Sequence, residues 1–550
     1  MLAAQNPIER LLVRAAETPD APWLYQSING VWSALSYSQI ADQVLRMAAA
    51  IQAQGIAPGS AIGIGGRNTA HWVMADLAIS AAGCVSVGLY PKQSVDHLQY
   101  ILKHCEAKLV FVGPMIDAQE FMDALPPELP TIGFPYPDAP KCKLDWSRLV
   151  EQHAPLAKPT PPGPDDLMTL VYTSGTTGYP KGVMLSWRNA QFTVEGLLKA
   201  MPPRREEIFF SYLPLAHMFE RGAVEISSLY LGAKIYFLEH LEKLPEQLAF
   251  VRPTRFFGVP LVYTRIQAGI LRKMPQEKLD RLVGIPLIGS LVKRKLKKAI
   301  GLDRARYIFS GAAPMPKPLL EWFDKLGIQV LQGYGMTENS IYASANTPSA
   351  NRIGSVGREM PGASTKISES GEILYKHPGV MLGYYKEPEK TKETFTEDGY
   401  LRTGDKGQLD ADGYLYITGR VKDIFKTMKG KYVAPAPIEG ALARNTDIDQ
   451  LCFVGSELKQ PIMLVSLNDA GKKKPRGDIE AGLIADMEAV NANLEPHEAI
   501  GKIVVVKDPW SIDNGLMTPT MKVKRPQVEQ RYCDLIRKEG ETRSKVAWEG

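Results

Sequence analysis

Short apolar runs alternate with longer amphipathic segments over much of the chain. Between residues 61 and 113, the runs AIGIGG, CVSVGLY and KLVFVG are separated by HWVMADLAIS and HLQYILKHC. The runs predict buried strands, and the segments between them predict helices. The same alternation recurs at KIYFLEH, RYIFSGAAP and IQVLQGYGMTE. Strands that alternate with helices in this way form parallel sheets, so we predict an α/β fold.

The pattern changes twice in the second half of the chain. After residue 365, short strands with glycine turns follow one another in SESGEILYK, TEDGYLRTGD and GQLDADGYLYITG, which predicts a small β region. Beyond GRVKDIF, a mixed segment begins that has the size of a small domain. We therefore expect a large N-terminal domain and a small α+β C-terminal domain.

The most apolar stretch, WVMADLAISAAGCVSVGLY at residues 72–90, approaches the length of a membrane span. It contains Asp76, two serines and two glycines, so we predict a buried helix followed by a buried strand. The N-terminus lacks the continuous apolar core of a signal peptide. The five cysteines form no C-x-x-C pair, which fits a reducing compartment. These features favour a cytoplasmic protein.

Charge excludes few functions. The 550 residues include 65 basic and 60 acidic side chains, and the net charge is +5. So small an excess argues against a dedicated nucleic-acid-binding protein, and acidic small molecules remain plausible ligands.

A loop rich in hydroxyl groups and glycines lies in LVYTSGTTGYPKGVML, residues 170–185. The flanks of Lys181 do not match a Walker loop, and the loop lacks the patterns of dinucleotide folds and serine hydrolases. Glycines can turn backbone N–H groups toward an anion, and the hydroxyl groups and Lys181 add donors and charge. A polyphosphate would suit this loop. The alternative is a solvated turn between a strand at 167–172 and a helix that begins near Ser186.

Five segments together resemble the adenylate-forming superfamily of acyl-CoA synthetases, adenylation domains and luciferases. They are YTSGTTGYPKG, GYGMTE, YLRTGD, GRVKD and TPTMKVKR, in the order of the family and spread over some 350 residues. The resemblance implies an N-terminal domain at residues 1–421 that binds ATP and the acyl substrate. It also implies a mobile C-terminal domain at 422–550, with the hinge at Lys422.

The resemblance assigns most of the nucleotide site. The β- and γ-phosphates of ATP would be bound by Thr173, Ser174, Gly175, Thr176, Thr177 and Lys181. Glu338 would bind Mg²⁺, and Thr337 would contact the α-phosphate. The adenine ring would be lined by Gly311, Ala312, Gly333, Tyr334 and Gly335.

Further roles follow from the same resemblance. Asp405 would accept hydrogen bonds from the ribose hydroxyls, and Arg420 would support the ribose or phosphate side. Lys522 is expected to be the lysine that promotes adenylation. The family usually has glycine before this lysine, whereas Met521 stands here, and Lys524 is the alternative. Lys429 would meet the phosphates of CoA.

The segment SYLPLAHMFERG, residues 211–222, resembles the long-chain fatty acyl-CoA synthetases of that superfamily. His217 and Phe219 would lie at the entrance of the acyl pocket, and FFGVP, residues 256–260, along its wall. The expected activity is that of a ligase that joins a fatty acid to CoA with ATP. The alternatives are an acyl-AMP ligase that loads a carrier protein and an idle adenylate-binding protein.

A basic cluster in LVKRKLKKAI, residues 291–300, accompanies apolar residues at helical spacing. Five of the six residues from Lys293 to Lys298 are basic. Such a surface is typical of peripheral contact with the inner face of an anionic membrane, although a solvated helix is the alternative.

Overall fold

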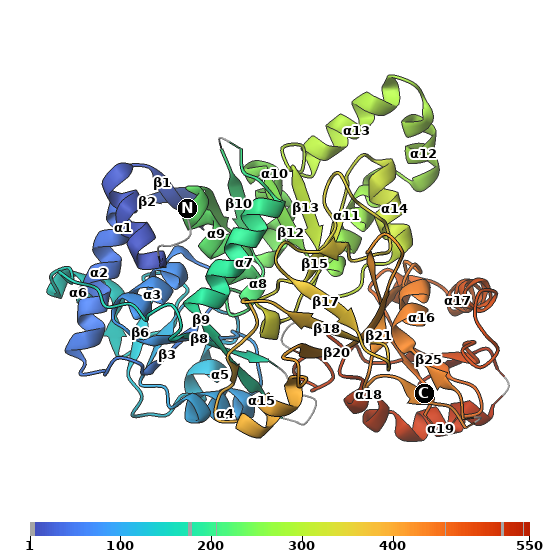
Figure 1. Cartoon of the computed structure of the whole chain (residues 1–550). Helices are drawn as coiled ribbons and strands as arrows, with labels where there is room; N and C mark the ends of the chain where they lie inside the picture. Colours follow the sequence, from blue (N-terminus) through green and yellow to red (C-terminus); the bar gives the residue numbers. More distant parts are fainter. Residues whose placement is uncertain are drawn as a thin grey trace.

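We describe the chain from a computed structural model, over residues 6–173, 179–204, 206–428, 430–456, 458–518, 522–542 and 544–550. Two large sheets form the N-terminal part, and helices cover them (Figure 1). The predicted alternation of strands and helices from 61 to 113 is confirmed. The strands β3 (Ala61–Gly65), β4 (Val85–Leu89) and β5 (Leu109–Val112) pair in parallel, and the helices α3 (Ala70–Ala81) and α4 (Val95–Cys105) connect them.

The first large sheet is mainly parallel, and β9 and β19 are antiparallel at its edge. In spatial order its strands are β19 (Gly383–Tyr384), β9 (Lys181–Ser186), β8 (Leu167–Thr173), β4 (Val85–Leu89), β3 (Ala61–Gly65), β5 (Leu109–Val112), β6 (Thr131–Gly133) and β7 (Leu144–Asp145).

The second large sheet is parallel from β14 to β1 and ends in antiparallel strands at both edges. Its order is β16 (Arg358–Glu359), β15 (Ser344–Ala345), β14 (Leu331–Tyr334), β13 (Tyr307–Ser310), β12 (Arg255–Gly258), β10 (Ile208–Ser211), β11 (Lys234–Phe237), β1 (Pro22–Ile28) and β2 (Val31–Ser36).

The small β region is an antiparallel sheet, as the glycine turns predict. It contains β17 (Ser364–Ile367), β18 (Glu372–Lys376), β20 (Leu401–Leu409) and β21 (Leu415–Arg420). The short pair β22 (Phe425–Lys426) and β23 (Tyr432–Val433) follows. The C-terminal sheet contains β24 (Ile448–Val454), β25 (Ile462–Leu467), β26 (Lys502–Val506) and β27 (Val546–Trp548).

The helices before residue 260 cover the two large sheets. They are α1 (Pro7–Glu17), α2 (Tyr37–Ala53), α3 (Ala70–Ala81), α4 (Val95–Cys105), α5 (Ala118–Asp123), α6 (Trp146–Gln152), α7 (Trp187–Ala200), α8 (Met218–Glu220), the π-helix η1 (Arg221–Ile226), α9 (Ser227–Leu231), the 3₁₀ turn η2 (Leu241–Lys243) and α10 (Leu244–Val251).

The later helices are α11 (Pro260–Lys273), α12 (Gln276–Gly284), α13 (Ile288–Ala299), α14 (Lys317–Lys325), the 3₁₀ turn η3 (Thr337–Asn339), α15 (Pro388–Thr394), α16 (Pro435–Leu442), the 3₁₀ turn η4 (Gly471–Lys473), α17 (Arg476–Asn491), α18 (Arg525–Arg531) and α19 (Cys533–Glu541). Most of the later helices pack on the sheets, whereas α12 and α13 pack against each other and project outward (Figure 1).

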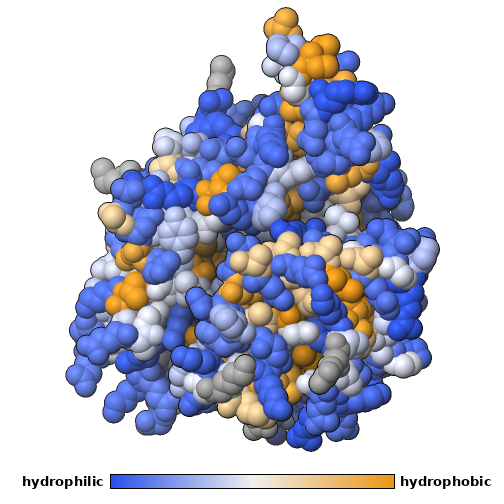
Figure 2. Space-filling model, turned by 90° about the vertical axis from the view of Figure 1, so that its right-hand side faces the viewer, coloured by the Kyte–Doolittle hydropathy of each residue, from blue (hydrophilic) through white to orange (hydrophobic). Residues whose placement is uncertain are grey.

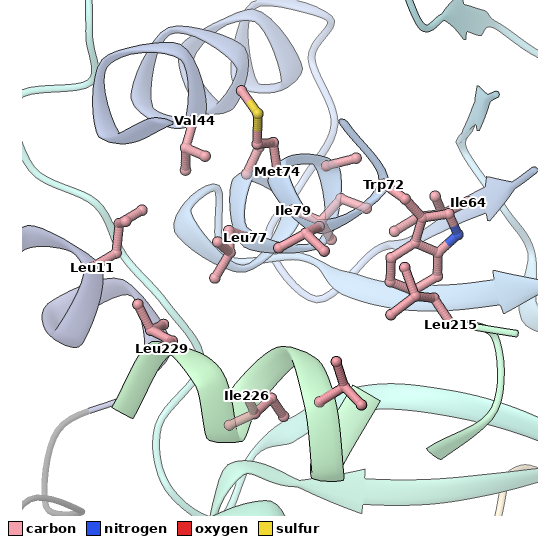
Figure 3. Close-up of a cluster of buried hydrophobic side chains, with 14 of the residues drawn as sticks. Leu11, Val44, Ile64, Trp72, Met74, Leu77, Ile79, Leu215, Ile226 and Leu229 are labelled. Carbon is pink, nitrogen blue, oxygen red and sulfur yellow. The ribbon is translucent and has the colours of Figure 1, made fainter. Parts of the chain in front are cut away.

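One hydrophobic core is shared by the two large sheets. Figure 3 shows Met74, Leu77 and Ile79 of α3 among side chains from α1, α2, η1 and α9. Protein surrounds helix α3, in which all residues except His71, Asp76 and Ser80 are buried. Each fully buried large side chain contributes about 1.5–3 kcal/mol. Residues 72–90 therefore form a buried helix and strand, as predicted. No helix within the described ranges is long and apolar enough to span a membrane.

Candidate functional site

The sequence-predicted residues come from distant parts of the chain. Thr173 ends β8 and Lys181 begins β9, and the two residues are paired across this antiparallel hairpin. The residues between them that we expect to bind phosphate, Ser174 to Thr177, lie outside the described ranges, as does Lys429. The alternative interpretation, a solvated turn, placed a helix that begins near Ser186 directly after the loop. Helix α7 does begin at Trp187 with Ser186 as its cap, but strand β9 intervenes.

Asp405 is held by two donors. It stands on β20 directly opposite Arg420 of β21, and the Arg420 Nε donates to Asp405 Oδ1 at 2.7 Å. The Tyr334 hydroxyl donates to Asp405 Oδ2 at 2.6 Å. Burial and the adjacent carboxylate raise the pKa of Tyr334 well above its usual value, so this phenol remains a donor. Each carboxylate oxygen has a second lone pair, so Asp405 can still accept from a sugar diol.

Glu338 and Lys181 meet at Tyr384, a residue that the sequence analysis missed. The Tyr384 hydroxyl donates to Glu338 Oε1 at 2.9 Å, and the Lys181 ammonium lies 4.6 Å from the centre of the Tyr384 ring. Tyr384 reaches this place because β19 pairs with β9, the strand that begins at Lys181. Its strand has only two residues, and no periodic pattern in the sequence could have indicated it.

The carboxylate of Glu338 fits a magnesium site that the nucleotide completes. Glu338 is buried on the turn η3 beside Thr337. Within the described residues, His, Cys, Asp and Glu side chains nowhere form a group of three that could hold a metal ion. Mg²⁺ is usually held by one or two carboxylates together with substrate phosphates and water. Glu338 would therefore supply the protein ligand.

Lys522 faces this cluster from the C-terminal part. Its backbone N–H donates to Thr518 Oγ1 at 3.0 Å. The side chain keeps access to solvent, but the surrounding protein desolvates the ammonium group and lowers its pKa. Arg420 lowers this pKa further, whereas Asp405 and Glu338 oppose the shift. Lys522 is thus within electrostatic reach of the site.

Lys524, the alternative, lies elsewhere. Its ammonium is near His97 of α4, where it contributes to the lowered pKa of that imidazole. Burial alone accounts for the lowered pKa of Lys524. Electrostatic coupling therefore favours Lys522 over Lys524 for chemistry at Asp405 and Glu338.

A pocket connects the predicted adenine residues with the predicted acyl residues. It encloses about 770 Å³, part of it open to solvent. Its lining includes the predicted adenine residues Gly311, Ala312, Gly333, Tyr334 and Gly335, and also His217, Phe219, Phe257 and the end of α7. Gly335 permits this shape, because a Cβ there would collide with the backbone of Ile341. The small residues leave room for a planar ring, and the apolar ones suit a hydrocarbon chain.

His217 caps α8, and its Nδ1 accepts from the Phe219 N–H at 3.1 Å. Burial, assisted by the nearby Lys522 ammonium, lowers the pKa of His217 to about 4. The imidazole at the pocket is therefore neutral near neutral pH.

The π-helix that follows His217 is anchored by buried charges. Arg221 is 1% exposed, and its Nη2 donates to both oxygens of Asp76 at 2.7 Å. Its Nη1 donates to Thr169 Oγ1 of β8, the strand that leads to the phosphate loop. Burial raises the pKa of the adjacent Glu220 to about 8, so this carboxyl is largely neutral. The π-helix, which lines the pocket at Ala223, and strand β8, which precedes the predicted phosphate loop, therefore share one buried support.

The fold agrees with comparisons against known proteins. Residues 11–385 match the family model described as AMP-binding enzyme. Residues 422–540 match the model described as AMP-binding enzyme C-terminal domain. The chain therefore belongs to the family of AMP-binding enzymes.

The curated relatives include acyl-CoA ligases. The long-chain-fatty-acid–CoA ligase ACSBG2 of Xenopus laevis is 32% identical, over 92% of this chain and 79% of the relative. Long chain acyl-CoA synthetase 6 of Arabidopsis thaliana, a peroxisomal protein, is 30% identical over 92% of this chain and 81% of its own length.

Solved structures share the fold. The adenylation domain of a carboxylate reductase from Mycobacterium chelonae superposes with a TM-score of 0.82 at 22% identity, over 98% of this chain and 91% of the domain. ATP-bound MatB from Rhodopseudomonas palustris gives a TM-score of 0.77 at 25% identity, over 96% of this chain and 99% of MatB.

Proposed function

We propose that this enzyme is an AMP-forming fatty acid–CoA ligase that uses ATP, Mg²⁺ and CoA. The observation that carries this proposal is a pocket in which the residues expected to line adenine adjoin an apolar wall, while Lys522 is electrostatically coupled to Asp405 and Glu338. The similarity to long-chain fatty acid–CoA ligases supports the choice of a medium- or long-chain acid.

In the first half-reaction, a carboxylate oxygen of the acid attacks the α-phosphorus of ATP. The new O–P bond forms as the bond to the bridging oxygen breaks, and pyrophosphate leaves. Two anions approach one another in this step, so cations and donors at the reacting groups lower the barrier. Lys522 and Thr337 would stabilise the α-phosphate and the incoming carboxylate, and Lys181 with the loop from Thr173 to Thr177 would hold the departing pyrophosphate.

The remaining residues orient the nucleotide. Asp405, fixed by Tyr334 and Arg420, would bind the ribose, and Gly311, Gly333 and Gly335 of the pocket would line the adenine ring. Glu338 would hold the Mg²⁺ ion, which neutralises phosphate charge when bound. Neutral His217 would lie between the nucleotide and the acyl chain without adding charge to an apolar entrance.

In the second half-reaction, the CoA sulfur attacks the carbonyl carbon of the acyl-adenylate, the thiol gives up its proton, and AMP leaves. Lys522 would then obstruct the thiol. We propose that the chain divides into domains at residues 1–421 and 422–550, and that rotation about Lys422 removes Lys522. Lys429 would then be available to the CoA phosphates.

A series of straight-chain acids from acetate to stearate tests the activity. We expect pyrophosphate release with every accepted acid and acyl-CoA formation that is greatest for medium or long chains. The acyl-AMP ligase would be favoured if the acyl-adenylate accumulates in the presence of CoA and its acyl group is transferred to a carrier-protein thiol. No reaction with any acid would favour an idle adenylate-binding protein.

The acyl substrate itself partitions into bilayers. We therefore propose that the enzyme collects it at the inner face of a membrane and touches that surface peripherally through the helix that contains Lys293 to Lys298. Co-sedimentation with anionic vesicles, compared before and after replacement of Lys293, Arg294, Lys297 and Lys298 with glutamine, tests this contact.

A further inference from the structure

Helices α12 and α13 form a hairpin that projects from the body of the molecule (Figure 1). The base of the hairpin is anchored in a second hydrophobic core, which includes side chains of α11 and α14. Leu279 is buried in this core, and Val283, Leu296 and Ile300 pack against it. The apolar face that the sequence predicts for α13 therefore has two parts with different surroundings. Its C-terminal part packs inward, and its N-terminal part remains outside the core.

The tip of the hairpin exposes four large apolar side chains. Leu287 is 88% exposed, Leu291 49%, Ile288 46% and Ile285 39%. In Figure 2, apolar side chains occupy the top of the molecule, where the hairpin projects in Figure 1. Four such residues within seven positions form a local patch, which is unlike the scattered exposed apolar residues of an ordinary surface.

The backbone at the tip is constrained. Leu287 has a φ of +64°, in a region that leucine rarely adopts and that costs about 1–2 kcal/mol. A Cβ at Gly289 would collide with the carbonyl of Val283, so only glycine lets the turn close this tightly. The backbone is therefore strained at Leu287, which is also the most exposed of the four apolar residues.

The charges behind the tip are of one sign. Residues 285–299 contain five basic and no acidic side chains, and the acidic residues of the hairpin, Glu277 and Asp280, belong to α12. None of the ion pairs found among the described residues involves a basic side chain of α13. Lys298 lies close enough to Asp303 to help lower the pKa of that carboxyl, and the other cations of α13 are available to a negatively charged surface.

We infer that the tip, Ile285 to Leu291, inserts into the outer part of an anionic bilayer while the basic residues of α13 meet its lipid headgroups. Apolar side chains ahead of lysines and arginines match the change from hydrocarbon to headgroup at a membrane surface. A convex tip suits a deformable lipid surface better than a rigid protein groove. Helix α13 has 12 residues and is too short to span the hydrocarbon core, so the contact is peripheral.

This inference rests on the proposed membrane contact and adds that apolar insertion, and not charge alone, holds the enzyme there. The decisive variant replaces Leu287, Ile288 and Leu291 with serine in the full chain. Its matched control replaces Val31 and Leu241 with serine, since these residues are 72% and 60% exposed and lie outside the hairpin. Flotation is measured with phosphatidylcholine vesicles, with and without about 30% phosphatidylglycerol.

We expect the unaltered protein and the control to bind the anionic vesicles and to remain bound in part at about 0.5 M salt, which screens surface charge. The Leu287, Ile288 and Leu291 variant should partition at least about tenfold less, and its residual binding should disappear in that salt. Vesicles of phosphatidylcholine alone should bind all proteins weakly.

Binding of the tip variant equal to that of the unaltered protein would overturn insertion and leave an electrostatic contact only. Absence of binding by the unaltered protein would overturn both the insertion and the membrane contact. Acyl-CoA formation is measured in parallel with the acid supplied on albumin. Equal rates for all the proteins show that the variants fold, and an absence of acyl-CoA in every sample would reject the ligase but not the insertion.

Discussion

At the scale of single residues, the contact between Tyr334 and Asp405 shows how the site holds a charge in place. The sequence motif places Tyr334 among the adenine residues, and the structure adds that its hydroxyl fixes the carboxylate expected to bind ribose. A hydrogen bond to a charged group is typically worth about 1.5–3 kcal/mol. Tyr334 would therefore affect nucleotide binding at both the base and the sugar.

We predict that Tyr334→Phe weakens AMP binding by roughly tenfold or more, because Asp405 loses the donor that orients it. Titration calorimetry with AMP measures the effect. Tyr400→Phe is the matched control, since it removes a phenol that hydrogen bonds to Ser364. Unchanged AMP affinity in Tyr334→Phe, with a lower melting temperature, would mean that this hydroxyl serves the fold alone.

At the scale of elements, a strand or helix could be predicted from the sequence where its apolar residues form a clear local pattern. Strands β3, β4 and β5 are continuous apolar runs, and their helices and parallel pairing follow from that pattern. Strand β9 was not predicted, because KGVMLS follows directly on the glycine-rich loop. Tyr384 and the buried partners of Arg221 were missed because their contacts join segments far apart in the chain.

The π-helix η1 and its flanking residue Glu220 give a prediction about pH. The ordinary pKa of a glutamate is 4.5, and burial raises that of Glu220 to about 8. Between these values the folded state keeps a proton that the unfolded state releases. The free energy of unfolding therefore falls as the pH rises through this window, by up to about 1.4 kcal/mol per pH unit from this group.

Glu220→Gln removes that dependence. We predict that the melting temperature of the unaltered protein falls by a few degrees relative to that of Glu220→Gln between about pH 6 and pH 8. Scanning fluorimetry over this range measures the difference, and Glu242→Gln, at an exposed position, is the control. Parallel melting curves for the unaltered protein and Glu220→Gln would show that Glu220 is ionised in the folded state.

At the scale of the whole molecule, an ion pair joins the N-terminal part to the C-terminal part. Lys92 Nζ lies 2.9 Å from Asp513 Oδ2, and this contact raises the pKa of Lys92. This ion pair and the electrostatic coupling of Lys522 to Glu338 and Asp405 are present in the same arrangement of the two parts. Both side chains are well exposed, so we expect a contribution of at most about 1 kcal/mol.

We predict that Asp513→Asn slows acyl-adenylate formation by no more than about fivefold at low salt and has no effect at high salt. Exchange of the two charges, Lys92→Asp with Asp513→Lys, should restore the rate. Asp508→Asn, at an exposed position in the same segment, is the control. A large effect that persists in high salt would mean that Asp513 acts within the site and not as a surface partner.

The decisive measurement for the role of Lys522 is the rate of each half-reaction in Lys522→Ala. Acyl-adenylate formation should fall by about two to three orders of magnitude, the usual effect of removing one preorganised stabilising group. The rate at which the acyl group of supplied acyl-adenylate is transferred to CoA should remain within about tenfold of that of the unaltered enzyme. Lys524→Ala should affect neither step strongly. Equal losses in both steps, or a larger loss of adenylation in Lys524→Ala, would contradict the assignment of Lys522 and the site built around it.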